Sequence, residues 1–82
     1  MASVLIHPDV LDWLDSRSPD LQERIRSKLH DAGEHPDHYL DKLTGRPEYK
    51  LRIGDYRALI LWDKTAGKLL VQEIDHRKNI YG

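Results

Sequence analysis

The chain has 82 residues, a length that fits one compact domain covering residues 1–82. Cysteine is absent, which excludes disulfides, thiolate zinc sites and thiol catalysis. No apolar run approaches the roughly 18 residues that a membrane span requires, and the first residues lack the basic region of a secretion signal. We therefore expect a cytoplasmic protein that makes no contact with a membrane.

Charge is distributed unevenly along the chain, although the net charge is only −1. Residues 1–41 hold four Lys or Arg against nine Asp or Glu, whereas residues 42–82 hold nine Lys or Arg against five Asp or Glu. This polarity indicates that the C-terminal half offers a face to an anionic partner.

The N-terminal half carries the signals of one strand and two helices. The apolar run Val4-Leu5-Ile6 predicts a brief first strand. Proline at a first helical position predicts one helix over Pro8 to Ser16, and Ser18 as N-cap predicts a second helix that stops at Gly33. Because the joint between them is very short, we expect the two helices to form an antiparallel hairpin.

The C-terminal half alternates between apolar and polar residues in the manner of strands. Residues 34–47 are predicted to be a connector, with a single helical turn beginning near His35. Three antiparallel strands are predicted over residues 48–53, 56–63 and 68–76, and the second should be central because it is apolar on both sides. The expected fold class is α+β in the order β-α-α-β-β-β, with the helices on one sheet face and the other face partly open. The residues expected to meet the helices are Tyr49, Leu51 and Ile53.

Three cations are predicted to share the open face. If Gly54-Asp55 is a two-residue hairpin loop, Arg52 faces Arg57 across the ladder, and Lys50 points to the same side. Like charges directly opposite each other destabilise a hairpin by up to roughly 1 kcal/mol. An anion between them, such as an RNA phosphate, would offset that cost; the alternative is three solvated charges on an open sheet.

Other chemistry finds little support in the sequence. His35-x-x-His38 has a spacing that a metal can use, but it lacks an obvious third ligand, so we expect neither a metal nor a cofactor. His76 is either a structural histidine or a group that titrates near a phosphate. What remains is a set of cations with an aromatic neighbour, suited to phosphate neutralisation and base stacking. The set comprises Lys50, Arg52, Arg57, Arg77 and Tyr81.

The two motifs that hold these residues resemble the RelE/ParE superfamily of toxins, and most closely its RelE branch. They are Tyr-Lys-Leu-Arg-Ile-Gly-Asp-Tyr-Arg at 49–57 and His-Arg-Lys-Asn-Ile-Tyr at 76–81, and the resemblance extends over nearly the whole chain. It implies the toxin of a type II toxin–antitoxin system, an mRNA interferase that enters the ribosomal A site and inhibits translation. The implied partners are a cognate antitoxin, in a toxin–antitoxin hetero-oligomer, and the ribosome with its mRNA.

The resemblance also implies a role for each site residue in a metal-independent cleavage, in which a ribose 2′-hydroxyl attacks the adjacent phosphate. Lys50 and Arg52 would lie near the attacking hydroxyl, and Arg57 would bind the phosphate in the transition state. Arg77 would assist the leaving oxygen, and Tyr81 would orient or stack on a base.

The slightly acidic net charge departs from the strongly basic character usual for RelE toxins, so ribosome docking would rest on one face. Two alternatives are a ParE-like toxin that inhibits DNA gyrase without nuclease activity, and an inactive toxin that only binds its antitoxin.

Overall fold

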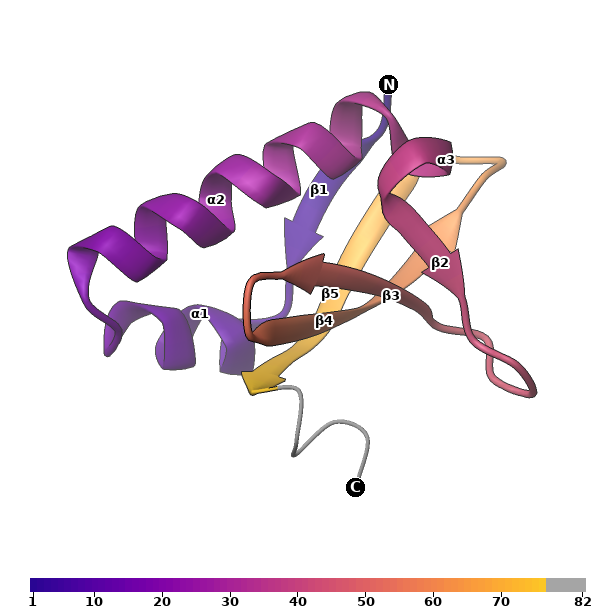
Figure 1. The fold of residues 1–82 in the computed structure, drawn as a ribbon. Helices are drawn as coiled ribbons and strands as arrows, with labels where there is room; N and C mark the ends of the chain where they lie inside the picture. Colours follow the sequence, from indigo (N-terminus) through magenta and orange to yellow (C-terminus); the bar gives the residue numbers. More distant parts are fainter. Residues whose placement is uncertain (77–82) are drawn as a thin grey trace.

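A computed structural model describes residues 1–76 of the chain, which form three helices and five strands (Figure 1). In chain order the elements are β1 (Ser3–Ile6), α1 (Pro8–Asp15), α2 (Pro19–Glu34), α3 (Pro36–Tyr39), β2 (Leu40–Lys42), β3 (Tyr49–Ile53), β4 (Tyr56–Asp63) and β5 (Lys68–His76).

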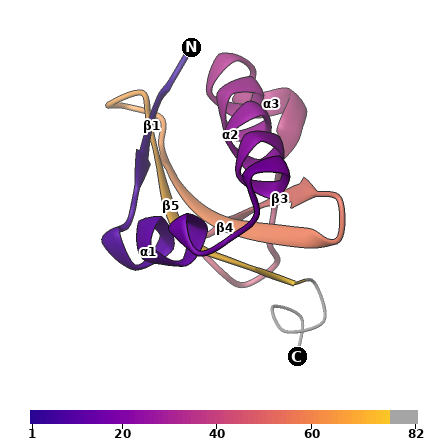
Figure 2. The ribbon, with the colours of Figure 1, turned by 90° about the vertical axis from the view of Figure 1, so that its left-hand side faces the viewer.

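The strands form one sheet in the order β1-β5-β4-β3-β2. β1 lies parallel to β5, and the other neighbours are antiparallel, so β4 is an inner strand as expected. Figure 2 shows the sheet curving around α2, with β1 on one side of the helix and β3 on the other. The predicted α+β class, with helices on one sheet face, is confirmed.

The two long helices begin at the residues that the sequence marks. His7 is the N-cap of α1, where its Nδ1 accepts a hydrogen bond from the backbone N–H of Asp9, and the Ser18 side chain accepts one from Leu21 in α2. These bonds satisfy N–H groups that a helix start leaves without a partner. None of the helices within residues 1–76 is both long and apolar enough to cross a membrane.

The core lies between the helices and one face of the sheet. Leu51 and Ile53 point into it as predicted, and Tyr49 packs at its margin. Burying one such side chain stabilises the fold by about 1.5–3 kcal/mol, so this layer is the main source of stability. The largest fully buried side chains are Leu14, Ile25, Leu51, Ile53, Ile60, Leu69 and Val71.

Gly33 does not end α2, and that prediction was wrong. The helix continues to Glu34, and Gly33 lies within it, where strand β1 approaches closely. The backbone N–H of Ala2 donates to the carbonyl of Gly33 at 2.7 Å. A Cβ on Gly33 would lie 3.0 Å from both the Ala2 carbonyl oxygen and Val4 Cγ2. The role of Gly33 is therefore to let α2 and β1 pack closely, and not to end the helix.

Replacing Gly33 with alanine should lower the free energy of unfolding by about 1–2 kcal/mol. Alanine favours a helix by up to about 1 kcal/mol over glycine, but here its methyl group must displace the backbone carbonyl of Ala2 and the side chain of Val4. Urea unfolding measures the change. Ser27→Ala, at an exposed position of the same helix, is the control and should leave stability unchanged or slightly raised. A Gly33→Ala variant as stable as Ser27→Ala would show that the contact is not tight.

The connector over residues 34–47 holds more structure than the sequence predicts. The expected helical turn is α3, but the strand β2 was not expected. β2 has only three residues, and of these only Leu40 is buried. The strand is therefore too short to show the alternation of apolar and polar residues from which strands are predicted.

A β-bulge in β5 shapes the end of the sheet that holds the predicted site. The β4–β5 register shifts between Leu59 and Ile60, leaving Gln72 as the extra residue. Val71 and Ile74 are both buried in the core although they are three residues apart. Beyond the bulge, Asp75 lies directly opposite Arg57.

Candidate nucleic-acid interface

The β3–β4 turn has the geometry that the sequence predicts. Ile53 pairs with Tyr56 and Arg52 pairs with Arg57, so Gly54 and Asp55 form a two-residue loop. Gly54 has a φ of 58° while Asp55 stays at negative φ, the pattern of a type II′ turn with glycine first. The loop thereby fixes which residues of the two strands lie opposite each other.

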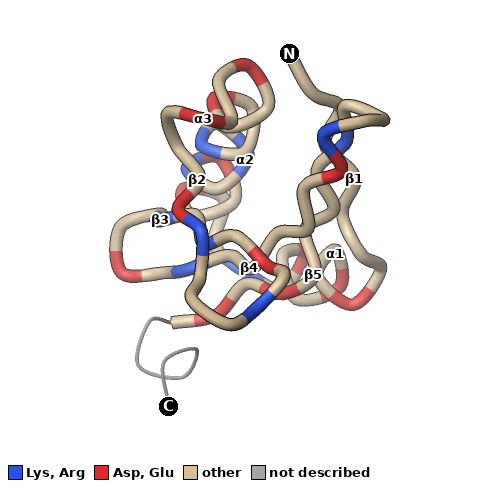
Figure 3. Tube along the Cα trace, turned by 90° about the vertical axis from the view of Figure 1, so that its right-hand side faces the viewer, with Lys and Arg blue, Asp and Glu red and all other residues tan. Residues whose placement is uncertain are grey.

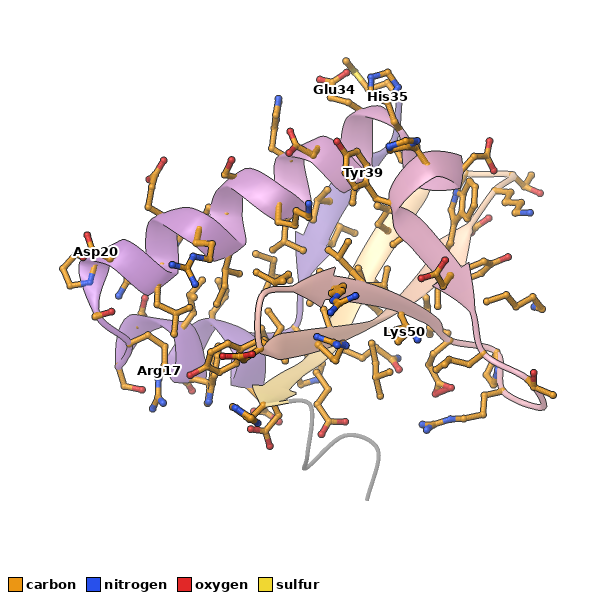
Figure 4. The ribbon with its side chains drawn as sticks, in the orientation of Figure 1. Arg17, Asp20, Glu34, His35, Tyr39 and Lys50 are labelled. Atoms are coloured by element: carbon orange, nitrogen blue, oxygen red, sulfur yellow. The ribbon has the colours of Figure 1, made fainter. Side chains whose placement is uncertain are left out.

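This register brings Lys50, Arg52 and Arg57 to the sheet face that points away from the helices. Arg52 and Arg57 are direct partners, and Lys50 lies two residues earlier on β3, opposite Leu59. Figure 4 shows Lys50 projecting from β3. The buried Leu51, by contrast, belongs to the opposite face. The predicted grouping of the three cations on one face is therefore present.

The three cations differ sharply in exposure. Arg52 is exposed and Lys50 is half-buried, but Arg57 is only 6% exposed. Nη1 of Arg57 donates to the carbonyl oxygens of Gly54 at 3.0 Å and Tyr56 at 2.8 Å. The alternative of three solvated charges is thus wrong for Arg57, because the turn carbonyls accept hydrogen bonds from its guanidinium. Its position is fixed by the hairpin.

Carboxylates also lie on this face, and the sequence reasoning missed them. Asp75 lies opposite Arg57, and Asp41 lies opposite Lys50. Figure 3 shows basic and acidic positions interspersed along the strands. The Asp75 pairing depends on the bulge at Gln72, which the alternation pattern of the strand does not reveal. The face therefore carries charges of both signs and is not uniformly basic.

His76 points to the helix side of the sheet. It pairs with Tyr56, and the two rings make an edge contact with centroids 5.7 Å apart. Tyr56 makes a second edge contact with Trp13 at 5.8 Å. This aromatic stack favours the structural alternative for His76, since Arg57 projects from the other face. The predicted site residues Arg77 and Tyr81 lie outside the described residues.

The His35-x-x-His38 spacing belongs to the start of α3. The His38 ring packs edge-on against Tyr39, with centroids 4.7 Å apart. Within residues 1–76, no group of three or more His, Asp or Glu side chains is placed to hold a metal ion.

Comparison with known proteins finds matches to this chain among solved structures. No protein-family model and no curated protein sequence matches it. Among solved structures, the RelBE2 toxin–antitoxin complex of Mycobacterium tuberculosis matches with a TM-score of 0.83 at 19% identity, covering 93% of this chain and 98% of that one. The archaeal RelE–RelB complex of Pyrococcus horikoshii matches with 0.79 at 22% identity, covering 93% and 94%. The RelBE complex of E. coli matches with 0.76 at 21% identity, covering 93% and 96%. The chain therefore has the fold found in these RelBE toxin–antitoxin structures.

Proposed function

We propose that the chain is the toxin of a type II toxin–antitoxin pair, a member of the RelE branch that cleaves mRNA in the ribosomal A site. The observation that carries this proposal is the register of the β3–β4 hairpin, which gathers Lys50, Arg52 and Arg57 on one face. Charge of this kind matches the needs of phosphate chemistry, because negative charge builds up on the phosphate oxygens in the transition state.

The reaction is an attack of the ribose 2′-oxygen on the adjacent phosphorus, which forms a 2′,3′-cyclic phosphate and breaks the bond to the 5′-oxygen of the next nucleotide. The 2′-hydroxyl loses a proton in this step, and the 5′-oxygen gains one and leaves as a hydroxyl group. Lys50 and Arg52 lie near the attacking hydroxyl, and Arg57 binds the phosphate oxygens. The bonds from Arg57 to the turn carbonyls hold its guanidinium in one orientation, so little ordering remains to be done when a phosphate binds. Arg77 assists the leaving 5′-oxygen, and Tyr81 orients a base.

The cognate antitoxin is the second proposed partner. The matched M. tuberculosis, P. horikoshii and E. coli structures are complexes of RelE-type toxins with their antitoxins, and one E. coli RelE variant was solved with an antitoxin RelBc peptide. Binding of a comparable antitoxin would keep this chain inactive in a hetero-oligomer.

Expression of the chain without an antitoxin tests the proposal. We expect translation to stop and primer extension to reveal cuts in messages that are being translated. A reporter message without a start codon is the control, and it should stay whole because no ribosome presents it. Intact messages together with DNA damage would instead indicate gyrase inhibition, and normal growth would indicate an inactive toxin.

A further inference from the structure

A cleft with a volume of about 270 Å³ opens at the edge of the sheet, beside the start of β2. β2 pairs with β3 only as far as Leu51, so strand β2 does not cover the segment from Arg52 to Gly54. α2 and α3 form the other walls, contributing Lys28 and Tyr39.

Basic side chains surround this cleft. Lys28 lines it, with Nζ 4.9 Å from the centre of the Tyr39 ring, and Figure 4 shows Tyr39 beside the last turns of α2. Arg24 lies one turn earlier on the same side of α2, and its Nη1 reaches the Gly54 turn, 3.5 Å from where a Cβ of Gly54 would lie. Arg52 completes the set.

Arg52 connects the cleft to the hairpin face. It lines the cleft and is also the direct cross-strand partner of Arg57. A polyanion held at Arg52 and Arg57 therefore has a basic path around the edge of β3 to Lys28 and Arg24. Asp41 also lines the cleft and opposes an anion there, but two cations, Lys28 and Arg52, line it as well, and Arg24 lies beside it at the Gly54 turn.

We propose that this cleft binds the sugar–phosphate backbone of the mRNA strand next to the phosphate that is cut. This inference rests on the proposed function and adds to it the path of the bound strand. Because a contact from a cation to a phosphate carries no sequence information, binding in the cleft should be independent of sequence and should weaken with salt.

A fluorescence anisotropy titration with a 2′-O-methyl oligoribonucleotide of about 12 nucleotides tests the cleft. The methyl group blocks the nucleophile, so binding is measured without cleavage. In the Arg24→Gln/Lys28→Gln double variant, Kd should rise about 10-fold. The magnitude of the slope of log K against log salt should fall by about 1.4, because each phosphate contact to a single strand contributes about 0.7. Arg26→Gln is the matched control, because Arg26 belongs to the same helix but lines the separate cavity beside β1. It should bind like the wild type.

Two further variants sharpen the reading. Arg24→Lys/Lys28→Arg keeps both charges and should bind like the wild type, whereas Asp41→Asn should bind more tightly. Unchanged Kd and slope in the double glutamine variant would overturn the proposal. So would a charge-keeping variant that binds the oligonucleotide as weakly as the double glutamine variant does. The proposed function fails separately, through intact messages in cells that express the wild-type chain.

Discussion

Replacing Arg52 with alanine is expected to slow mRNA cleavage by about 100- to 1,000-fold, the loss typical of removing one charge-stabilising group from an active site. Arg52 is exposed, so its loss should change the free energy of unfolding by no more than about 0.5 kcal/mol. The measurements are single-turnover cleavage of a ribosome-bound message and thermal unfolding followed by circular dichroism.

Lys68→Ala is the matched control for Arg52→Ala. Lys68 is an exposed cation at the start of β5, where it pairs with Ser3 on β1, away from the β3–β4 turn. Its removal changes the net charge by the same amount and should leave cleavage at the wild-type rate. Equal slowing in both variants would mean that total charge matters and that the position of Arg52 does not.

Replacing Arg57 with alanine is expected to have two effects, a loss of cleavage and a loss of stability. The guanidinium of Arg57 is buried and donates to two carbonyls of the hairpin, and hydrogen bonds from charged donors contribute about 1.5–3 kcal/mol each. We expect the free energy of unfolding to fall by about 2–4 kcal/mol, since the carbonyls of Gly54 and Tyr56 lose this donor. Urea unfolding measures this loss of free energy. In thermal unfolding, the same loss should lower Tm by about 10–20 °C in a domain of this size.

Arg57→Lys separates charge from geometry. A lysine keeps the positive charge but lacks the planar fork of the guanidinium, so it should recover part of the stability and little of the cleavage. If Arg57→Ala unfolds at the wild-type urea concentration, the guanidinium does not hold the turn. A loss of cleavage in Arg57→Ala can therefore arise from unfolding alone, which makes Arg52→Ala the cleaner test of whether the hairpin cations take part in cleavage.

The hairpin was predictable because a two-residue loop that begins with glycine fixes the register of the two flanking strands. That register places Arg52 opposite Arg57 and sends Leu51 to the core, and both outcomes follow from the period of two along a strand. The starts of α1 at Pro8 and of α2 at Pro19 were equally predictable, because the signal for a helix start lies in residues within one turn of it.

The features that sequence reasoning missed depend on contacts between distant segments. Gly33 carries the signal of a helix end, and only the approach of β1 reveals its packing role. Asp75 lies opposite Arg57 because of a bulge, and the apolar pattern of β5 does not distinguish this bulge from regular pairing. Arg57 is buried while its guanidinium donates hydrogen bonds to carbonyls of its own turn, and no pattern of residue types in the sequence predicts these bonds.

The most direct test of the hairpin as a grip on mRNA is primer extension on a defined message bound to purified ribosomes, with wild-type and Arg52→Ala chains side by side. We expect the wild-type chain to cut the message within the A-site codon and the variant to leave it whole over the same time. A message that stays whole with the wild-type chain, or one that both chains cut equally, would contradict this role.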